Sequence, residues 1–134
     1  MLSIYRSDDQ PKLRQATLDV DGAEYAGEVL NNQAHGSGTM TWPDANKYVG
    51  EFRDGERHGQ GRFTYSDGRQ YLGEFLGGKR HGRGTLTEPD GGQYRGGYRM
   101  DKRHGVGTMR YADGTEKWAV WRNGEFAGWL VSED

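Results

Sequence analysis

The sequence contains no cysteine, so a disulfide framework and thiolate chemistry are both excluded. Proline is rare, with 3 residues in 134, and no stretch approaches the roughly 18 apolar residues of a membrane-spanning helix. The segment from Met1 to Asp9 lacks the apolar run of a signal peptide. These absences lead us to expect a single soluble domain in the cytoplasm.

Apolar residues are also scarce, since only 32% of the chain is hydrophobic. So low a content approaches the composition of disordered proteins, but disorder also requires a high net charge, and the net charge here is −2. Aromatic residues make up 12% of the chain, and there are 23 glycines. Because each aromatic side chain buries a large area, we expect a core of rings instead of an aliphatic core.

A motif that recurs every 23 residues accounts for most of the chain. Its fullest copy runs from Tyr48 to Gly61 as Tyr-Val-Gly-Glu-Phe-Arg-Asp-Gly-Glu-Arg-His-Gly-Gln-Gly, and further copies begin at Tyr25, Tyr71 and Tyr94. A fixed period in this range indicates a repeat protein, in which each unit packs against the next. An aspartate also recurs between copies, at Asp21, Asp44, Asp67, Asp90 and Asp113.

The motif resembles the MORN repeat, whose usual form is Tyr-x-Gly-Glu-aromatic, a glycine-containing turn, His-Gly-x-Gly and Asp-Gly. The resemblance covers roughly residues 19–130. It implies an all-β fold, an elongated and twisted antiparallel sheet of stacked β-hairpins. Similar repeats precede the catalytic domain of some phosphoinositide kinases, occur in junctional membrane proteins and accompany a lysine methyltransferase domain. The resemblance therefore implies an interaction module and supplies no catalytic activity.

The period also divides the chain into units. Residues 1–18 precede the register, and 15–18 are expected to form a short strand that covers the first hairpin. The repeat domain is expected over 19–131, with units at about 19–42, 43–65, 66–88, 89–111 and 112–131. The last unit is degenerate, since Lys117 stands at its tyrosine position and Ala127 at its histidine position. We interpret it as a cap, because terminal repeats otherwise expose a sheet edge.

Alternation along a strand predicts which residues share a face of the sheet. The aromatic face is expected to bury Tyr48, Phe52, Phe63, Tyr65, Tyr71 and Phe75. The opposite face is expected to carry Glu51, Gln60, Arg62 and Glu74. Turns within units and turns between units are expected to lie along opposite long edges of the sheet.

Four histidines recur in register, at His35, His58, His81 and His104. They fall two strands apart and hence about 10 Å from one another, whereas zinc needs its ligands at about 2.0–2.3 Å. A hydrogen bond that closes a turn is the simpler role for each. The repeated glutamates are also too far apart for a catalytic carboxylate pair. No phosphate loop or dinucleotide fingerprint occurs, so we expect no active site, metal or cofactor.

Basic residues collect on the edge of the turns within units, and they form the first candidate site. This candidate basic edge comprises Arg57, Lys79, Arg80, Lys102 and Arg103. Such an edge attracts acidic proteins or anionic lipid headgroups, or it only keeps the sheet soluble. Nucleic acid is disfavoured as a partner, because the sequence pI of about 6.1 is far below that of nucleic-acid-binding domains.

The second candidate site is an aromatic patch in the last unit, made of Trp118, Trp121 and Trp129. It would serve a partner or self-association, unless these rings only cap the stack. The sequence thus predicts a non-catalytic scaffold or adaptor that binds another protein. The alternative is peripheral membrane binding to anionic phospholipids such as phosphoinositides, through the basic edge.

Overall fold

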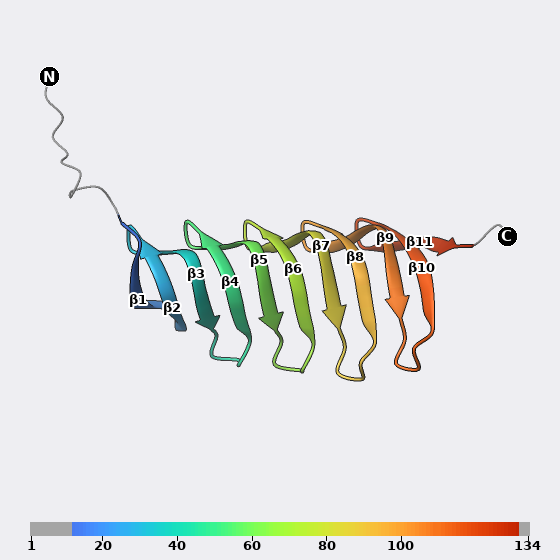
Figure 1. Ribbon diagram of the computed structural model, residues 1–134, viewed down its shortest axis with the longest axis horizontal. Coiled ribbons are helices and arrows are strands. Elements are labelled where there is room, and N and C mark those ends of the chain that lie inside the picture. Colours follow the sequence, from blue (N-terminus) through green and yellow to red (C-terminus); the bar gives the residue numbers. More distant parts are fainter. Residues whose placement is uncertain (1–11, 132–134) are drawn as a thin grey trace, which may run out of the picture.

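The computed structural model describes residues 12–131, which form one antiparallel sheet of 11 strands in sequence order (Figure 1). The strands are β1 (Arg14–Val20), β2 (Ala23–Leu30), β3 (Gln33–Thr41), β4 (Lys47–Arg53), β5 (Glu56–Thr64), β6 (Gln70–Leu76), β7 (Lys79–Thr87), β8 (Gln93–Arg99), β9 (Lys102–Arg110), β10 (Glu116–Arg122) and β11 (Glu125–Leu130). The predicted all-β fold of stacked hairpins is therefore confirmed. Residues 1–11 and 132–134 lie outside the described range, and with them the whole segment inspected for a signal peptide, Met1 to Asp9.

Strand β1 pairs with β2 along its whole length, from Arg14 opposite Val29 to Val20 opposite Ala23. It is longer than the strand expected over 15–18, and it covers the first hairpin as predicted. Five hairpins follow, each made of two successive strands from β2–β3 to β10–β11. Their short turns lie along one long edge and the linking loops along the other (Figure 1). No helix within residues 12–131 is long and apolar enough to cross a membrane.

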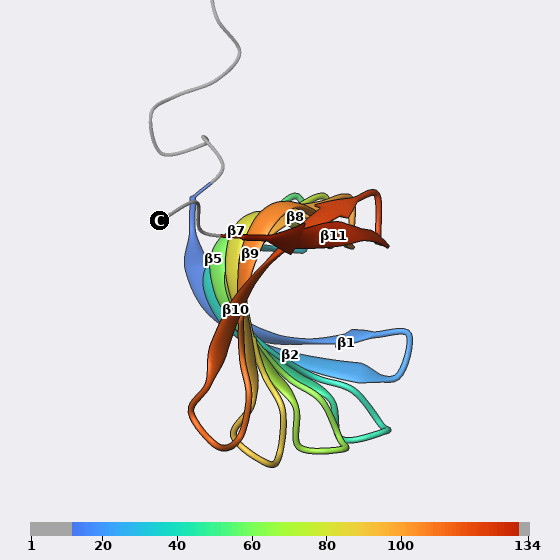
Figure 2. The same cartoon turned by 90° about the vertical axis from the view of Figure 1, so that its right-hand side faces the viewer.

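The first four hairpins are interrupted by a β-bulge at the same place, whereas β10–β11 has a smaller irregularity between Val120 and Trp121. In the second hairpin Gly50 pairs with Gly61 and Phe52 with Arg57, so Glu51 alone faces the three residues 58–60. The surplus residues are accommodated by Gly59, whose φ of +64° lies in the left-handed region that favours glycine. Because a bulge bends its strand, the repetition of the bulge bends the whole sheet. Figure 2 shows the result, a trough with a concave and a convex side.

The glutamate of the motif accepts a backbone N–H group that the bulge leaves without a partner on the neighbouring strand. The carboxylate of Glu51 accepts the backbone N–H of Gln60, and Glu74 accepts that of Arg83. The tyrosine acts on the same segment, since the Tyr48 hydroxyl donates to the carbonyl oxygen of Glu51 at 2.8 Å. Tyrosine and glutamate therefore recur in the motif because both stabilise the bulge.

The core is a row of aromatic rings on the concave side of the sheet. Tyr48 is fully buried and makes edge contacts with Phe52 and Phe75, both at 5.0 Å between ring centroids. It lies so close to the backbone of the next strand that a Cβ at Gly61 would come within 2.2 Å of its hydroxyl oxygen. The predicted face is confirmed, with Tyr65 half-buried and the other five named rings buried.

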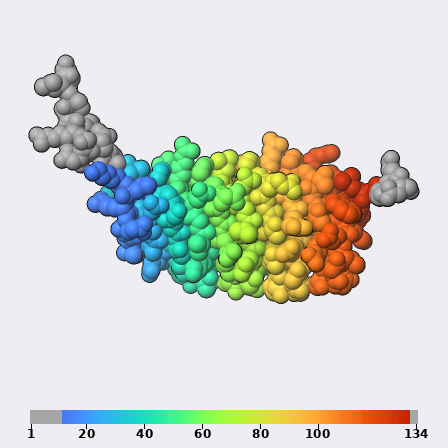
Figure 3. All heavy atoms as spheres, in the orientation of Figure 1, coloured from blue at the N-terminus to red at the C-terminus, as the bar shows by residue number. Residues whose placement is uncertain are grey.

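The hairpins pack in a linear series, as the successive bands of colour in Figure 3 show. Extensive contacts join only consecutive strands. The concave side therefore runs along the stack as a groove whose floor repeats once per hairpin.

Candidate ligand-binding groove

Three arginines share one position in successive hairpins and lie on the concave side. Arg57, Arg80 and Arg103 stand opposite Phe52, Phe75 and Tyr98 across their hairpins. The Arg57 guanidinium carbon lies 5.0 Å from the Phe63 ring centroid, 5.5 Å from that of Trp42 and 5.6 Å from that of Phe75. A guanidinium within about 6 Å of a ring centroid is attracted by the negative face of the ring. Arg57 therefore covers the aromatic core.

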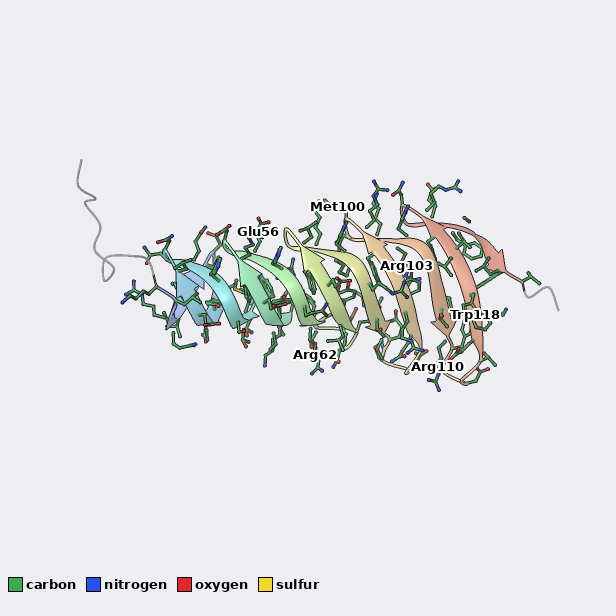
Figure 4. The ribbon with its side chains drawn as sticks, turned by 45° about the horizontal axis from the view of Figure 1, so that its top comes forward. Glu56, Arg62, Met100, Arg103, Arg110 and Trp118 are labelled. Carbon is green, nitrogen blue, oxygen red and sulfur yellow. The ribbon has the colours of Figure 1, made fainter. Side chains whose placement is uncertain are left out.

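The other two arginines repeat this arrangement. Arg80 lies 4.9 Å from the centroid of Tyr98, and Arg103 lies 4.5 Å from Tyr94 and 5.0 Å from Trp121. Figure 4 accordingly places Arg103 over the body of the sheet, whereas Met100 projects at a rim. We call the three arginines, with the rings beneath them, the arginine column.

The candidate basic edge is thus two separate sets of residues. Lys79 and Lys102 are exposed beside the turns, at the predicted edge. Arg57, Arg80 and Arg103 are half-buried and stacked on rings. The sequence-based placement of the three arginines at the exposed edge is therefore wrong, because their aliphatic stems and planar heads pack on the aromatic core.

Only the middle arginine of the column has a carboxylate partner within residues 12–131. The Arg80 Nε donates to Asp101 Oδ1 at 2.7 Å. Arg57 instead donates from Nη2 to the carbonyl oxygen of Gly78, at 2.6 Å. The position of Asp101 in the 23-residue frame is occupied by Gly78 for Arg57 and by Gly124 for Arg103.

Burial and charge act in opposite directions on these arginines. Burial lowers the pKa of Arg57, and the charge of the distant Asp101 offsets this only in part. For Arg80, burial lowers the pKa, but the hydrogen bond and charge of Asp101, together with Tyr65 and Tyr98, outweigh it, so the pKa is raised. Arg57 is therefore a partly desolvated cation without a neutralising partner among the described residues.

Two buried donors lie close to Arg103. The Tyr98 hydroxyl and the Trp121 Nε1 have no hydrogen-bond partner within the described part of the chain. Burial raises the pKa of Tyr98, whereas the charges of Arg80 and Arg103 and the close approach of the Arg103 guanidinium group to its hydroxyl oxygen lower it. This approach does not meet hydrogen-bond geometry, and it leaves the hydroxyl proton without an acceptor. Buried polar groups are normally hydrogen-bonded, which makes this pair of donors exceptional.

The groove contains two hollows. One, of about 160 Å³, is lined by Tyr94, Arg103, Met109 and Tyr111 among others. The second, of about 240 Å³, lies at the N-terminal end and is lined by Leu18, Ala34 and Met40 among others. Ala34 holds the frame position of the three arginines, so the column ends there and leaves this hollow. Sequence reasoning placed Tyr65 on this face but missed Trp42, Glu88 and Tyr111, although all four share one frame position that could have indicated them.

The three tryptophans of the candidate aromatic patch are not brought together. Trp118 stands opposite Thr108 on the convex side and is 51% exposed. Trp121 is half-buried on the concave side, where it contacts Phe126, and Phe126 contacts Trp129 at 4.9 Å. Trp121 and Trp129 thus extend the groove wall into the last hairpin, while Trp118 belongs to another surface.

The histidines hold one hairpin to the next. His35 Nδ1 accepts the backbone N–H of Asp54, and His81 Nδ1 accepts that of Met100. This is the turn-closing role expected from the sequence, although His35, His81 and His104 each close the turn of the following unit. Among residues 12–131, no three histidine or acidic side chains converge on a point where a metal ion could bind.

An open, single-layer sheet in which one bulged hairpin recurs every 23 residues defines a β-hairpin repeat protein. The MORN repeat model matches residues 25–47, 48–68, 71–93 and 94–116, about two thirds of the chain, and the chain belongs to this family. The four matches cover the first four hairpins and leave the degenerate fifth unmatched. MORN repeats are generally modules for interaction with proteins or membranes. No curated protein matches the chain.

Proposed function

We propose that the chain is a non-catalytic scaffold or adaptor that binds another protein, and that it holds an extended segment of this partner in the concave groove. The observation that carries the proposal is the arginine column. It lines the groove across three hairpins, yet Arg57 and Arg103 have no neutralising partner among the described residues. A groove of this kind is incomplete without an occupant.

The residues that line the groove are of the types that dominate binding energies. Arginine, tyrosine and tryptophan are the commonest hot-spot residues of protein interfaces. Here they are already held in place, since Arg57 is stacked among Trp42, Phe63 and Phe75. Little side-chain entropy is then lost when a partner binds, and this favours affinity.

The most regular polar residues of the motif have structural roles, which supports binding over catalysis. Glu51 and Glu74 accept backbone N–H groups at bulges, and His35 and His81 accept them at turns. A general base must instead be free to reach a substrate proton. The proposal accordingly includes no catalytic residue and no cofactor.

A selection from a displayed library of random peptides, read out by methyl NMR, tests the proposal. Peptides that bind the chain should shift the methyl signals of Met40 and Met109, which line the groove hollows. The methyl signals of Val49 and Leu72, exposed on the convex side, should stay in place. Selected peptides that shift only Val49 and Leu72, or the absence of any selected peptide, would contradict the groove as the binding surface.

A second candidate function is peripheral binding to anionic phospholipids, and the rim of the short turns favours it. Lys79 and Lys102 are exposed there beside Leu76 and Met100, which are 45% and 49% exposed. Basic side chains near an anionic bilayer contribute about 1 kcal/mol each, and apolar neighbours add insertion into the headgroup region. Vesicles containing phosphatidylserine should carry the chain in flotation, and Lys79→Glu with Lys102→Glu should release it. Equal flotation of this double variant would exclude the rim.

A further inference from the structure

We infer that the segment bound in the groove carries two carboxylate side chains about six residues apart, one bound at Arg57 and the other at Arg103, with an uncharged residue facing Arg80 between them. The inference rests on the proposed function and specifies the chemistry of the partner segment.

The first argument is the difference among three equivalent positions. The same backbone hydrogen bond occurs at all three positions. The N–H groups of Gly78, Asp101 and Gly124 donate to the carbonyl oxygens of Arg57, Arg80 and Arg103, respectively. Only Asp101 adds a carboxylate, which neutralises Arg80. A ligand would therefore meet a cation at Arg57, a neutral pair at Arg80 and a second cation at Arg103.

The Arg103 position also offers donors beyond its own guanidinium group. The Tyr98 hydroxyl and Trp121 Nε1 are buried and have no partner among the described residues. Tyr98 is only 4% exposed. An indole N–H can only donate, so the group that completes it must be an acceptor. The Arg103 guanidinium group matches a carboxylate, which has two oxygens and accepts several hydrogen bonds, and a bound carboxylate reaches the two buried donors only after neighbouring side chains shift. The hollow of about 160 Å³ beside Arg103 provides the space, and its lining includes a second cation, Arg110, as well as the carboxylates of Glu88 and Asp90.

The Arg57 position is the other cationic site. Its guanidinium group has five N–H donors, and only Nη2 has an acceptor among residues 12–131, the carbonyl oxygen of Gly78. The three surrounding rings fix the plane of the group. A fixed planar fork is well suited to a carboxylate, because the two can form parallel hydrogen bonds.

The spacing of the carboxylates follows from the geometry of the sheet. Arg57 and Arg103 are two hairpins apart, and four strand spacings of 4.7–4.9 Å give about 19 Å. An extended chain advances about 3.3 Å per residue, so about six residues separate two side chains that reach both sites. An even spacing also directs both side chains to the same side of the extended segment.

A selection from the random peptide library on the wild-type chain provides the first test. Enriched peptides should share two acidic residues about six positions apart and lack a third acidic residue two or four positions from the first. Some peptides could bind in the groove, as judged by shifts of the Met40 and Met109 methyl signals, and yet be neutral or basic. That result would overturn the inference and leave the proposed function standing. The absence of groove-binding peptides would contradict both.

The second test supplies each free arginine with the partner that Arg80 already has. Gly78→Asp with Gly124→Asp places carboxylates beside Arg57 and Arg103, and Asn replaces Asp in the control. Both residues suit these positions, since Asp101 has a φ of +75° and the two glycines have +81° and +87°. The Asp variant should bind an enriched peptide at least tenfold more weakly, and the Asn control should bind within about threefold of the wild type. Equal binding by both variants would overturn the inference.

The third test is a gain of function in the middle of the groove. Asp101→Gly should free Arg80 and make it equivalent to Arg57. Selection on this variant should enrich an additional acidic residue between the other two, two or four positions from the first, because only even spacings direct a side chain to the groove. An unchanged peptide pattern, with the melting temperature confirming a folded variant, would show that the carboxylate of Asp101 does not determine what the groove accepts.

Discussion

Arg80 and Asp101 are 21 residues apart in the sequence, yet Arg80 Nε lies 2.7 Å from Asp101 Oδ1. The pair joins the hairpin β6–β7 to the turn of the hairpin β8–β9. Two further hydrogen bonds reinforce it: the Asp101 N–H donates to the Arg80 carbonyl oxygen, and Arg80 Nη2 donates to the Asp101 carbonyl oxygen. The arginine therefore has two roles at once, as a cover for the rings of Tyr71 and Tyr98 and as a link between units.

Replacement of Arg80 by alanine should destabilise the protein. The variant loses packing on Tyr98 and hydrogen bonds to Asp101, and we expect a loss of about 1–3 kcal/mol in the free energy of unfolding, as for hydrogen bonds to charged groups. Urea titration measures this loss. Lys79→Ala is the matched control, because Lys79 is exposed and its removal should cost under about 0.5 kcal/mol. Equal costs for the two variants would show that the column does not cover the core.

Truncation of a central ring should cost much more than truncation of a terminal one. Phe75 is 4% exposed between Tyr48 and Tyr71, and Phe75→Ala should cost about 3–5 kcal/mol. Phe126 is 49% exposed, so Phe126→Ala should cost about 1 kcal/mol or less. Thermal and urea unfolding of both variants would measure the difference, and similar losses would contradict a core organised around the central rings.

A methyl group added at Gly61 should disrupt the second hairpin. Its Cβ would come within about 2.2–2.4 Å of the Tyr48 ring, which has no space to move. Gly105→Ala is the control, since nothing lies within 4 Å of a Cβ there and the cost is limited to its φ of +80°. We expect Gly105→Ala to cost about 1–2 kcal/mol and Gly61→Ala distinctly more. A smaller loss at Gly61 in urea titration would exclude the close tyrosine packing.

Stability should fall at alkaline pH. Burial raises the pKa of Tyr48 and Tyr94 to about 12, and it also raises the pKa of Tyr25 and Tyr71. Tyrosines in the unfolded chain titrate near pH 10, so above that pH the unfolded chain binds fewer protons than the folded one. The tyrosine contribution is fully present below about pH 10 and declines toward pH 12, by up to about 1.4 kcal/mol per pH unit for each tyrosine. A urea midpoint that is constant from about pH 9 to pH 11.5 would disprove this.

Loss of a histidine should loosen the turn of the next hairpin more than it lowers overall stability. His81 Nδ1 accepts the Met100 N–H, so His81→Ala should speed hydrogen exchange at the Met100 amide. The Asn123 amide is bound to His104 and serves as the internal control. Equal acceleration at both amides would indicate general destabilisation and no specific link.

The period of the sequence was enough to predict the strands, the shared aromatic face and the two kinds of turn. Tyr48 and Phe52 have the same parity in one strand, and their burial follows directly. The trough was not predictable in this way. It arises from bulges opposite Glu51 and its equivalents, and alternation of residues says nothing about where a ladder is interrupted.

The sequence predicted which basic residues belong to the candidate site, but it placed the three arginines at the edge of the sheet and not on its concave side. Arg57 was assigned to the edge because it follows a turn, as Lys79 does. Lys79 and Arg80 are adjacent after the turn, and strand alternation decides which of them faces the concave side. Arg80 alternates in step with Gly82 and Gly84 on the aromatic face, and Lys79 falls on the opposite face. Parity was applied to the rings and could have been extended to the arginines. The absence of a carboxylate beside Arg57 becomes visible only when positions 78, 101 and 124 are aligned.

The links between hairpins have a consequence for how this protein can change its length. The Arg80–Asp101 pair, the His81–Met100 hydrogen bond and the Asn46–Ser66 hydrogen bond each connect one unit to the unit that follows. Insertion or deletion of one whole 23-residue unit would preserve the links that recur between units, such as the backbone hydrogen bonds to the carbonyl oxygens of Arg57, Arg80 and Arg103, although the Arg80–Asp101 pair survives only if both of its units stay adjacent. It would alter the length of the trough by about 10 Å without altering its cross-section. Copy number would then act as a ruler, setting how many residues of a partner can be held and how far apart its anchoring side chains must lie.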